Sequence, residues 1–275
     1  MWGPPITDSD RDLKVLKAVE NCNFSIGIGF TFQTSYATAK TTFPSKTVAV
    51  LDGCATGITC VVFNEEEGSF LAGAVAALKS SSKMVGFVSG VSNLPVIERF
   101  EAGFREGVKH IDPNITVMVE YLSDFPDLSG FGNPGLAENI SLAMYDQGVD
   151  VIMHASGSSG FGVFKAAYEK TTSDNSTHRW AIGVDADQYM SVPALYRPHV
   201  LTSMMKNVDV ATKRIIDDYM NGTMSSFYRL GASEDWVGVS KTGGFFTSHY
   251  DTIDTLIAEI SNGTIVVSGN LSAVV

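Results

Sequence analysis

The feature that most constrains this chain is a local pattern that recurs along it: a short apolar run ends in glycine, serine or aspartate, and a helix-like segment follows. Strands buried on both faces of a parallel sheet read as near-continuous apolar runs, and the helices that cover them carry apolar residues three or four positions apart. The pattern therefore predicts an α/β fold with parallel sheets. The strand and its polar end recur at 48–53, 85–90, 151–157 and 182–187.

Other segments continue this alternation, so the whole chain is expected to fold in the same class. Its 275 residues suffice for two modest lobes, and no low-complexity linker separates them. The chain must then cross between the lobes without a flexible tether. Strands are predicted at 24–28, 47–51, 59–63, 84–88, 115–121, 149–154, 180–184, 200–204 and 236–239, and helices at 8–20, 32–42, 69–78, 95–104, 135–147, 161–168, 207–221 and 249–260.

Charge and motif content exclude several classes of function. The net charge is −11 and no cluster of lysine and arginine occurs, which argues against nucleic acid and anionic membrane as main partners. No apolar run has the length needed to cross a bilayer. Zinc-ligand spacings, a Walker A loop and a complete dinucleotide-binding glycine motif are also missing. We therefore expect neither a metal nor a cofactor.

The three cysteines, Cys22, Cys54 and Cys60, leave two interpretations open. Cys54 and Cys60 could form a local disulfide, or all three could be separate buried thiols. Because no Cys-x-x-Cys motif is present, separate buried thiols are the favoured expectation.

Glycosylation sequons are unusually frequent. Seven of the twelve asparagines begin Asn-x-Ser/Thr, whereas chance placement would give roughly two. We expect a glycoprotein that passes a glycosylating secretory pathway, with some sequons buried and unmodified. The first residues lack a signal-peptide pattern, so either export is absent or the chain begins downstream of the true start. The sequon asparagines are Asn23, Asn114, Asn139, Asn175, Asn221, Asn262 and Asn270.

A catalytic interpretation is possible for residues near two predicted strand ends. Ser156, Ser158 or Ser159 could in principle be a serine nucleophile that His154 and Asp185 activate. The nucleophile-elbow motif is not present, however, because the segment 157–160 (GSSG) has the wrong spacing. A packed histidine at the end of a strand is the favoured interpretation of His154, and we expect the protein not to be an enzyme.

Ligand binding explains the charged strand-end residues better than catalysis does. Asp52 and Asp185 could accept hydrogen bonds from ligand hydroxyl or ring N–H groups, or they could simply be solvated strand ends. Lys206 ends another predicted strand, and it could pair with Asp185, donate to a ligand or lie on the surface.

Two loops offer further candidate ligand contacts. Phe131 lies between glycines and close to a proline, where an aromatic ring could stack on a ligand or fill a small satellite core. The loop with Gly157 and Ser158 opens a predicted helix and could offer backbone N–H groups.

Six segments together carry a family resemblance: 67–73 (EGSFLAG), 85–90 (VGFVSG), 95–104 (PVIERFEAGF), 145–152 (YDQGVDVI), 183–188 (GVDADQ) and 201–206 (LTSMMK). In this order they are similar to the basic membrane protein (BMP) family of substrate-binding lipoproteins. These are the purine nucleoside receptor-type (PnrA-like) proteins that serve ABC transporters. The match runs from about residue 15 to about residue 240.

The resemblance implies a type I periplasmic-binding-protein fold. Two lobes of parallel sheet, flanked by helices and joined by a three-strand hinge, would close on a nucleoside. Lobe 1 would comprise approximately residues 1–83 and 207–235, and lobe 2 approximately residues 84–206 and 236–260.

The resemblance also implies roles for single residues. Asp52 resembles the acidic residue that reads the edge of the base, and Phe131 resembles one of two aromatic residues that sandwich the purine. Asp185 and Lys206 resemble the pair that holds the ribose hydroxyls. A base offers two faces for stacking, and a diol suits a carboxylate together with a donor, so these roles are chemically sound.

The chain also departs from the family. Gly157 and Ser158 fall in the family's loop near the sugar, but the family's first strand and the Asp/Gly-rich loop after it have no equivalent. The neighbours of that strand are expected to lose pairing on one side. The lipid-bearing cysteine is missing, and Asn133 stands where an acidic residue is common. We therefore expect a truncated gene product.

The leading functional hypothesis is non-catalytic binding of a purine nucleoside, for uptake with an ABC permease or for sensing. One alternative is a binding module for a sugar or another small ligand. Another is a nucleoside-cleaving enzyme, since stacking and ribose contacts also suit N-glycosidic cleavage. We expect a monomer without a nucleic-acid partner, secreted or at the cell surface, as the membrane-associated family members are.

Overall fold

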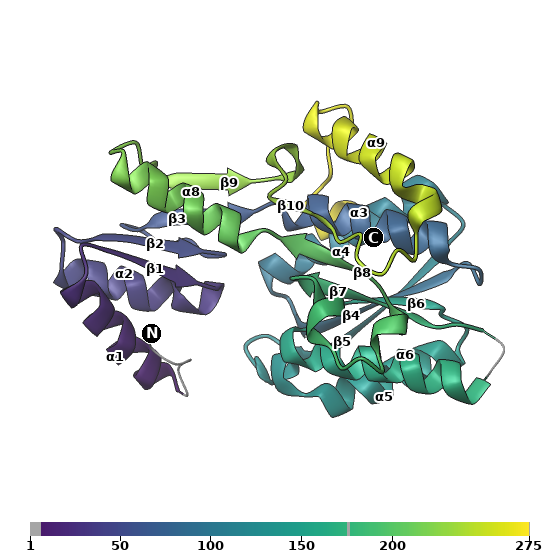
Figure 1. The fold of residues 1–275 in the computed structure, drawn as a ribbon. Helices are drawn as coiled ribbons and strands as arrows, with labels where there is room; N and C mark the ends of the chain where they lie inside the picture. Colours follow the sequence, from purple (N-terminus) through teal and green to yellow (C-terminus); the bar gives the residue numbers. More distant parts are fainter. Residues whose placement is uncertain (1–6, 175–176, 275) are drawn as a thin grey trace. The chain divides into compact units, whose positions relative to one another are not determined.

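The computed structural model describes residues 7–174 and 177–274, and it divides into two compact units (Figure 1). Each unit has its own sheet with helices packed on it, which confirms the predicted α/β class. The chain passes between the units three times. The first unit consists of Met1–Phe63 and Val208–Leu230, and the second consists of Asn64–Asn207 and Gly231–Val275.

The first unit is built on a four-stranded parallel sheet with the order β1-β2-β3-β9. Helices α1 and α2 pack together on one face of this sheet, and α8 covers the other (Figure 1). Side chains from α1, α2, β2 and β3 form the core between sheet and helices. The elements are β1 (Phe24–Ile28), β2 (Thr47–Leu51), β3 (Thr59–Phe63), β9 (Phe227–Leu230), α1 (Asp8–Asn21), α2 (Gln33–Thr42) and α8 (Val208–Met220).

The expected loss of strand pairing does not occur at β2. Strands β1 and β2 pair directly, in parallel register from Phe24 opposite Thr47 to Ile28 opposite Leu51. Strand β2 also pairs with β3 on its other side. The backbone groups of β2 are therefore satisfied within this sheet, as buried backbone requires.

A disulfide between Cys54 and Cys60 corrects the expectation of separate buried thiols. The loop after β2 returns to β3 with its ends close together, so the two Cα atoms lie 4.6 Å apart, within the usual disulfide range. The expectation for Cys22 was wrong as well, because this free cysteine is exposed.

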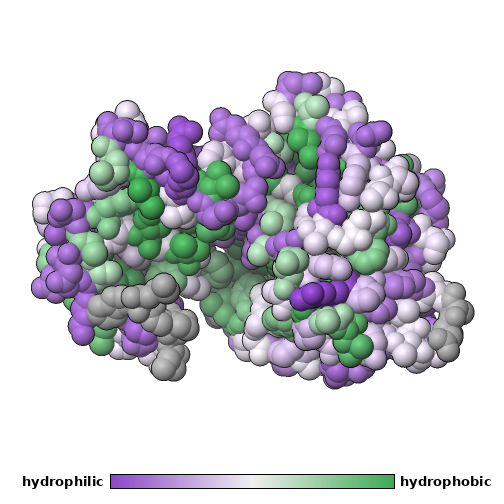
Figure 2. Space-filling view, viewed as in Figure 1, coloured by the Kyte–Doolittle hydropathy of each residue, from purple (hydrophilic) through white to green (hydrophobic). Residues whose placement is uncertain are grey.

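Part of the first unit's surface is apolar. Met220 of α8 and Phe227 of β9 are exposed, and Figure 2 shows hydrophobic atoms among polar ones on this unit. Ion pairs four residues apart, such as Lys213 with Asp217, lie beside them on α8.

The second unit is built on a six-stranded sheet with the order β10-β8-β7-β6-β4-β5, in which only the β10–β8 pair is antiparallel. Helices α5 and α6 cover one face, α3 and α4 cover the other, and α9 packs outside α3 (Figure 1). None of the described helices is long and apolar enough to span a membrane. The elements are α3 (Glu65–Lys79), β4 (Met84–Ser92), α4 (Pro95–Ile111), β5 (Thr116–Asp124), α5 (Pro134–Asp146), β6 (Val151–Ala155), α6 (Gly160–Asp174), β7 (Trp180–Asp185), α7 (Gln188–Ser191), β8 (Val200–Lys206), β10 (Val237–Val239) and α9 (Tyr250–Ser261).

Helix α3 belongs to the second unit, whereas the sequence-based boundary near residue 83 would place it in the first. Helix α3 is apolar on nearly all sides, and it is covered by α4, α9, β8 and β10 of the second unit. The C-terminal tail also joins this unit, because Lys109 Nζ donates to the Val274 carbonyl and Ser268 N donates to Glu106.

The clearest differences from the sequence-based prediction are in three strands, β4, β5 and β9. Strand β9 was not predicted, because it is only four residues long and mostly exposed at a sheet edge, so it lacks a buried pattern. Strand β4 runs to Ser92, beyond the predicted turn at Ser89 and Gly90, because β5 pairs with it up to Asp124.

Helices α3 and α4 approach each other so closely that only glycine fits at their contact. A Cβ atom added at Gly107 would lie 1.9 Å from the Phe70 carbonyl oxygen, and one at Gly103 would lie 2.1 Å from the Glu66 carbonyl oxygen. Both neighbours are helix backbone, which cannot move aside as a side chain could.

Replacing Gly107 by alanine should therefore force the helices apart and lower the free energy of unfolding by about 2–3 kcal/mol, as overpacking does. Urea denaturation measures this change. Gly135→Ala is the matched control, because Gly135 also lies in a helix and its nearest neighbour to an added Cβ is 3.9 Å away. It should leave stability unchanged or raise it. Equal effects of the two substitutions would refute the close contact.

Candidate functional site

Five of the six predicted ligand-binding residues gather at one edge of the second unit's sheet. Parallel strands deliver their following loops to the same edge, and in open α/β sheets that edge binds ligands. Strands β5, β6, β7 and β8 all contribute here. The five residues are Phe131, Gly157, Ser158, Asp185 and Lys206.

The ammonium group of Lys206 is buried and lies between two carboxylates. Its Nζ is 3.2 Å from Glu65 Oε1 and 3.7 Å from Asp185 Oδ1, and it lies 5.0 Å from the ring centroid of Phe100. Glu65 is also buried, and its Oε2 accepts a hydrogen bond from Arg99 Nε at 2.7 Å. Because a buried charge needs a partner of opposite sign, Glu65 compensates the Lys206 ammonium group and holds it in place.

Asp185 presents its carboxylate outward from the end of β7. Its backbone is left-handed, with φ 66°, and its side chain is 56% exposed. One oxygen faces Lys206 while much of the group remains open to solvent. The pair thus places a hydrogen-bond acceptor and a donor side by side, an arrangement that two neighbouring hydroxyl groups of a ligand would satisfy.

A buried hydrogen-bond network holds the turn that carries Asp185. Gln188 Oε1 accepts from the backbone N–H of Val184 at 2.8 Å and lies 2.9 Å from His154 Nε2. The Gln188 backbone N–H in turn donates to Ser203 Oγ at 3.0 Å. An amide oxygen only accepts hydrogen bonds, so His154 carries its proton on Nε2.

His154 is a packed histidine rather than a catalytic base. It is fully buried, and the edge of its ring meets Phe164 with centroids 5.3 Å apart. Burial lowers its pKa from 6.5 to about 4, although the hydrogen bond to Gln188 acts in the opposite direction. Ser156, 3.4 Å from its Nδ1, is equally buried, and Asp185 pairs with Lys206 instead. The Ser–His–Asp arrangement is therefore not formed.

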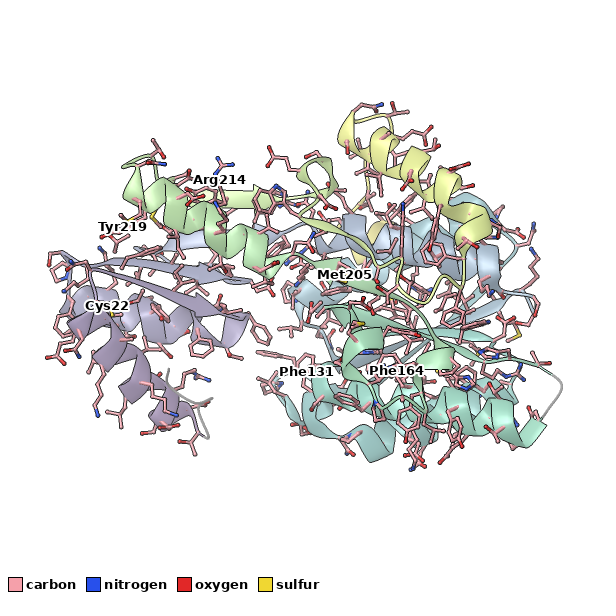
Figure 3. All side chains as sticks on the ribbon, in the orientation of Figure 1. Cys22, Phe131, Phe164, Met205, Arg214 and Tyr219 are labelled. Atoms are coloured by element: carbon pink, nitrogen blue, oxygen red, sulfur yellow. A yellow bond between two sulfur atoms is a disulfide. The ribbon has the colours of Figure 1, made fainter. Side chains whose placement is uncertain are left out.

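Phe131 is held in a short 3-10 segment, Ser129–Gly132, after β5 (Figure 3). A Cβ atom at Gly90 would lie 2.4 Å from Phe131 Cδ1, so the ring packs directly on the backbone of β4. The hydroxyl of Ser158 donates to the Phe131 carbonyl at 2.8 Å, and Gly157 lies against the same residue with φ 56°. The loop after β6 therefore fixes an aromatic ring that stays partly exposed.

Asp52 lies in the first unit, at the carboxyl end of β2. Its φ is 62°, and its backbone N–H donates to the Val61 carbonyl at 2.8 Å. The disulfide between Cys54 and Cys60 closes the loop that follows it. Asp52 thus occupies a strand end of the same kind as Asp185, in the other unit.

The sequence-based analysis missed two supporting residues. Glu65 opens α3, where an acidic residue in the first turn is unremarkable, and Gln188 is the last residue of the family segment 183–188 but was assigned no role there. Only their distances to Lys206 and His154 reveal their part in the site.

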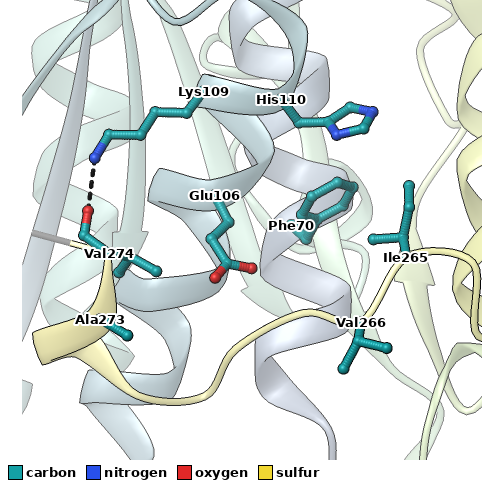
Figure 4. A pocket seen from close by; sticks show the side chains of 8 residues that line it. All are labelled: Phe70, Glu106, Lys109, His110, Ile265, Val266, Ala273 and Val274. Carbon is teal, nitrogen blue, oxygen red and sulfur yellow. Dashed lines mark hydrogen bonds between the residues drawn. The ribbon is translucent and has the colours of Figure 1, made fainter.

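A pocket of about 500 Å³ lies elsewhere in the second unit (Figure 4). It is lined by Phe70, by the C-terminal end of α4 at residues 106–110 and by the tail, with Val266 among its apolar residues. Because α4 runs back from the carboxyl ends of the strands, this end of the helix lies toward their amino ends. The pocket is thus separate from the strand-end site. No group of three or more metal-ligating side chains occurs within residues 7–174 and 177–274.

Acidification should destabilise the folded chain through His154. The unfolded chain takes up a proton near the ordinary pKa of 6.5, but the folded chain does so only near pH 4, so stability is full above pH 6.5 and falls toward pH 4. At pH 5 the expected loss from this residue is about 2 kcal/mol. Burial also lowers the pKa values of His178 and His199, so these two residues should likewise reduce the stability of the folded chain as the pH falls.

Urea denaturation of the wild type and of His154→Gln at pH 7 and pH 5 tests this expectation. The difference in stability between the two pH values should shrink by about 2 kcal/mol in the variant, whatever its absolute stability. His110→Gln is the matched control, because the imidazole of His110 is exposed in the last turn of α4 rather than buried. Identical pH dependence of wild type and His154→Gln would contradict the buried neutral imidazole.

Comparison with known proteins agrees with the fold. The chain is 34% identical over 228 residues to the "CD4+ T-cell-stimulating antigen" of Listeria monocytogenes, covering 78% of this chain and 61% of that protein. It is 32% identical over 205 residues to the "ABC transporter nucleoside-binding protein BmpA" of Lactococcus lactis, covering 71% of this chain and 56% of that protein. The chain thus spans about three fifths of the length of these curated relatives.

A solved ABC transporter solute-binding protein from Aeropyrum pernix has the same fold, with a TM-score of 0.76 at 19% identity, covering 98% of this chain and 84% of that one. The family model described as "ABC transporter substrate-binding protein PnrA-like" matches residues 7–270. The match extends over nearly the whole chain and includes every strand and helix discussed above. The chain therefore belongs to the Bmp family of PnrA-like ABC transporter substrate-binding proteins.

Proposed function

We propose that this protein binds a purine nucleoside without chemically changing it, as the solute-binding component of an ABC-type uptake system or as a sensor derived from one. The observation that carries the proposal is the Asp185–Lys206 pair at the carboxyl edge of the second sheet. The name of the Lactococcus lactis relative supports the ligand class. An ABC permease would be the partner, and a monomer at the cell surface would be the working form.

The ribose would be held by the charged pair. One ribose hydroxyl donates to the exposed carboxylate of Asp185, and a neighbouring hydroxyl accepts from the ammonium group of Lys206. Glu65 and Arg99 hold that ammonium in advance, so little conformational entropy is lost on binding. Charge-assisted hydrogen bonds of this kind are the strong ones.

The base would stack on Phe131. The ring is fixed by its packing on Gly90 and by the Ser158 hydrogen bond to its carbonyl, so it offers a rigid surface to a planar ligand. Gly157 and Ser158 would lie near the sugar. Asp52, at a strand end of the first unit, has a carboxylate suited to accept the N–H groups of a base.

A sugar is the second candidate ligand, because the Asp185–Lys206 pair would satisfy the diol of free ribose equally well. Nucleoside cleavage finds less support, since the histidine nearest the pair is buried and hydrogen-bonded to Gln188. Incubation with inosine should therefore release no free base.

Calorimetric titration with adenosine, guanosine, inosine and ribose tests the proposal. We expect heat from at least one purine nucleoside, and about 10–100-fold weaker binding in Asp185→Asn, because a charge-assisted hydrogen bond is lost. Asp146→Asn is the control, since Asp146 is an exposed carboxylate of the same unit that pairs with Lys170. Absence of heat with every nucleoside at millimolar concentration would refute the proposal.

Phe131→Ala separates the two candidate ligands. Loss of base stacking should weaken nucleoside binding by about 1–3 kcal/mol and leave ribose binding unchanged. Phe161→Ala provides the control, because Phe161 is an exposed phenylalanine on α6 of the same unit. If the wild type binds ribose but no nucleoside, the sugar is the ligand.

A further inference from the structure

The glycosylation sequons lie on the surface wherever the structure describes them. Asn175 lies outside the described residues, and the other six sequon asparagines are exposed. The sequence led us to expect some buried sequons, but none of these six asparagines is buried. The exposed asparagines are Asn23, Asn114, Asn139, Asn221, Asn262 and Asn270.

Three of these asparagines share a position in the fold. Asn23 comes directly before β1, Asn114 before β5, and Asn221 lies in the loop between α8 and β9. Loops that lead from a helix into a parallel strand lie at the amino edge of the sheet. In each unit these sequons therefore lie at the edge opposite the strand ends that carry Asp52, Asp185 and Lys206.

Turn chemistry accounts for some of the asparagines but not for the sequons. Asn221 and Asn262 each precede a left-handed glycine at the end of a helix, Gly222 with φ 70° and Gly263 with φ 78°. Asparagine followed by glycine is favoured at such an end. Nothing in that geometry requires serine or threonine two residues after the asparagine.

Two sequon hydroxyls are unfavourable in the folded protein. Ser25 of the Asn23 sequon and Ser141 of the Asn139 sequon are buried, and their Oγ atoms have no hydrogen-bond partner within the described part of the chain. A buried polar atom without a partner costs stability, so alanine would suit the fold better at both positions. The sequon accounts for both hydroxyls, since the described fold makes no hydrogen bond to either.

We propose that the chain is N-glycosylated before it folds, with glycans at the amino edges of the two sheets and at Asn139 on α5. The transferring enzyme reads each hydroxyl on the extended chain, which explains hydroxyls that the fold later buries. In the transfer, asparagine Nδ2 forms a bond to the anomeric carbon of an oligosaccharide. The bond from that carbon to a lipid diphosphate donor breaks, and the diphosphate and one Nδ2 proton are released.

The arrangement keeps glycans away from the strand-end residues. A glycan is bulky and hydrated, and one at a strand-end loop would obstruct a ligand there. None of the described sequons lies in a loop that leads directly from a strand of either parallel sheet into the next helix.

Peptide mapping by mass spectrometry, on the full chain isolated from its native source, tests the proposal. Digestion with a peptide N-glycosidase should convert the glycosylated asparagines to aspartate, and we expect this at Asn23, Asn114, Asn139 and Asn221. Ligand binding should be the same before and after digestion. A chain in which all four asparagines are unmodified would overturn the proposal, and this result does not depend on which ligand is bound.

Serine variants separate a sequon role from a structural role. Ser25→Ala and Ser141→Ala, produced in the same host, should abolish the glycan at Asn23 and at Asn139 respectively. After enzymatic deglycosylation, neither variant should have a lower unfolding midpoint than the wild type. Ser69→Ala is the matched control, because Ser69 is buried without a partner in the same way but belongs to no sequon. It should change no glycan. Unchanged glycans, or a lowered midpoint, in the two sequon variants would contradict the proposal.

Discussion

The buried ammonium group of Lys206 needs a carboxylate beside it, and this requirement ties the candidate site to the core of the second unit. Glu65 meets it from the start of α3, and Arg99 of α4 holds the other oxygen of Glu65. Helix α3 can occupy this position because glycines of α4, such as Gly107, allow the backbones of the two helices to come into direct contact. The close contact between α3 and α4 thus places the buried ion network, and that network places the partner of the exposed carboxylate of Asp185.

Close backbone approach also shapes the remainder of the site. Phe131 packs on the bare backbone of Gly90, and the loop after β6 holds it through Ser158. Gln188 fixes the turn with Asp185 through hydrogen bonds to the backbone of Val184 and to the neutral ring of His154. The groups that a ligand would meet are therefore held in place before it binds, which is how binding sites limit their entropic cost.

Family membership and chemistry lead to the same functional proposal by separate routes. The family model spans the described fold, whereas the charged pair and the fixed aromatic ring would suit a ribose and a base whatever the family. The sequons are explained by neither route. They lie away from the strand ends, as a secreted binding protein would need, and two of them include hydroxyls that the fold leaves unsatisfied.

Sequence alone determined the α/β class and most element positions, because buried parallel strands such as β2, β4 and β6 are marked by their own apolar residues. It also identified Asp52, Asp185 and Lys206 by their places at strand ends, and the family resemblance implied their roles. Tertiary structure alone decided the features that depend on distant segments: the edge strand β9, the disulfide of Cys54 with Cys60, the unit to which α3 belongs, and the partnership of Glu65 with Lys206. Local patterns record which residues are buried, but not which distant groups meet once they are buried.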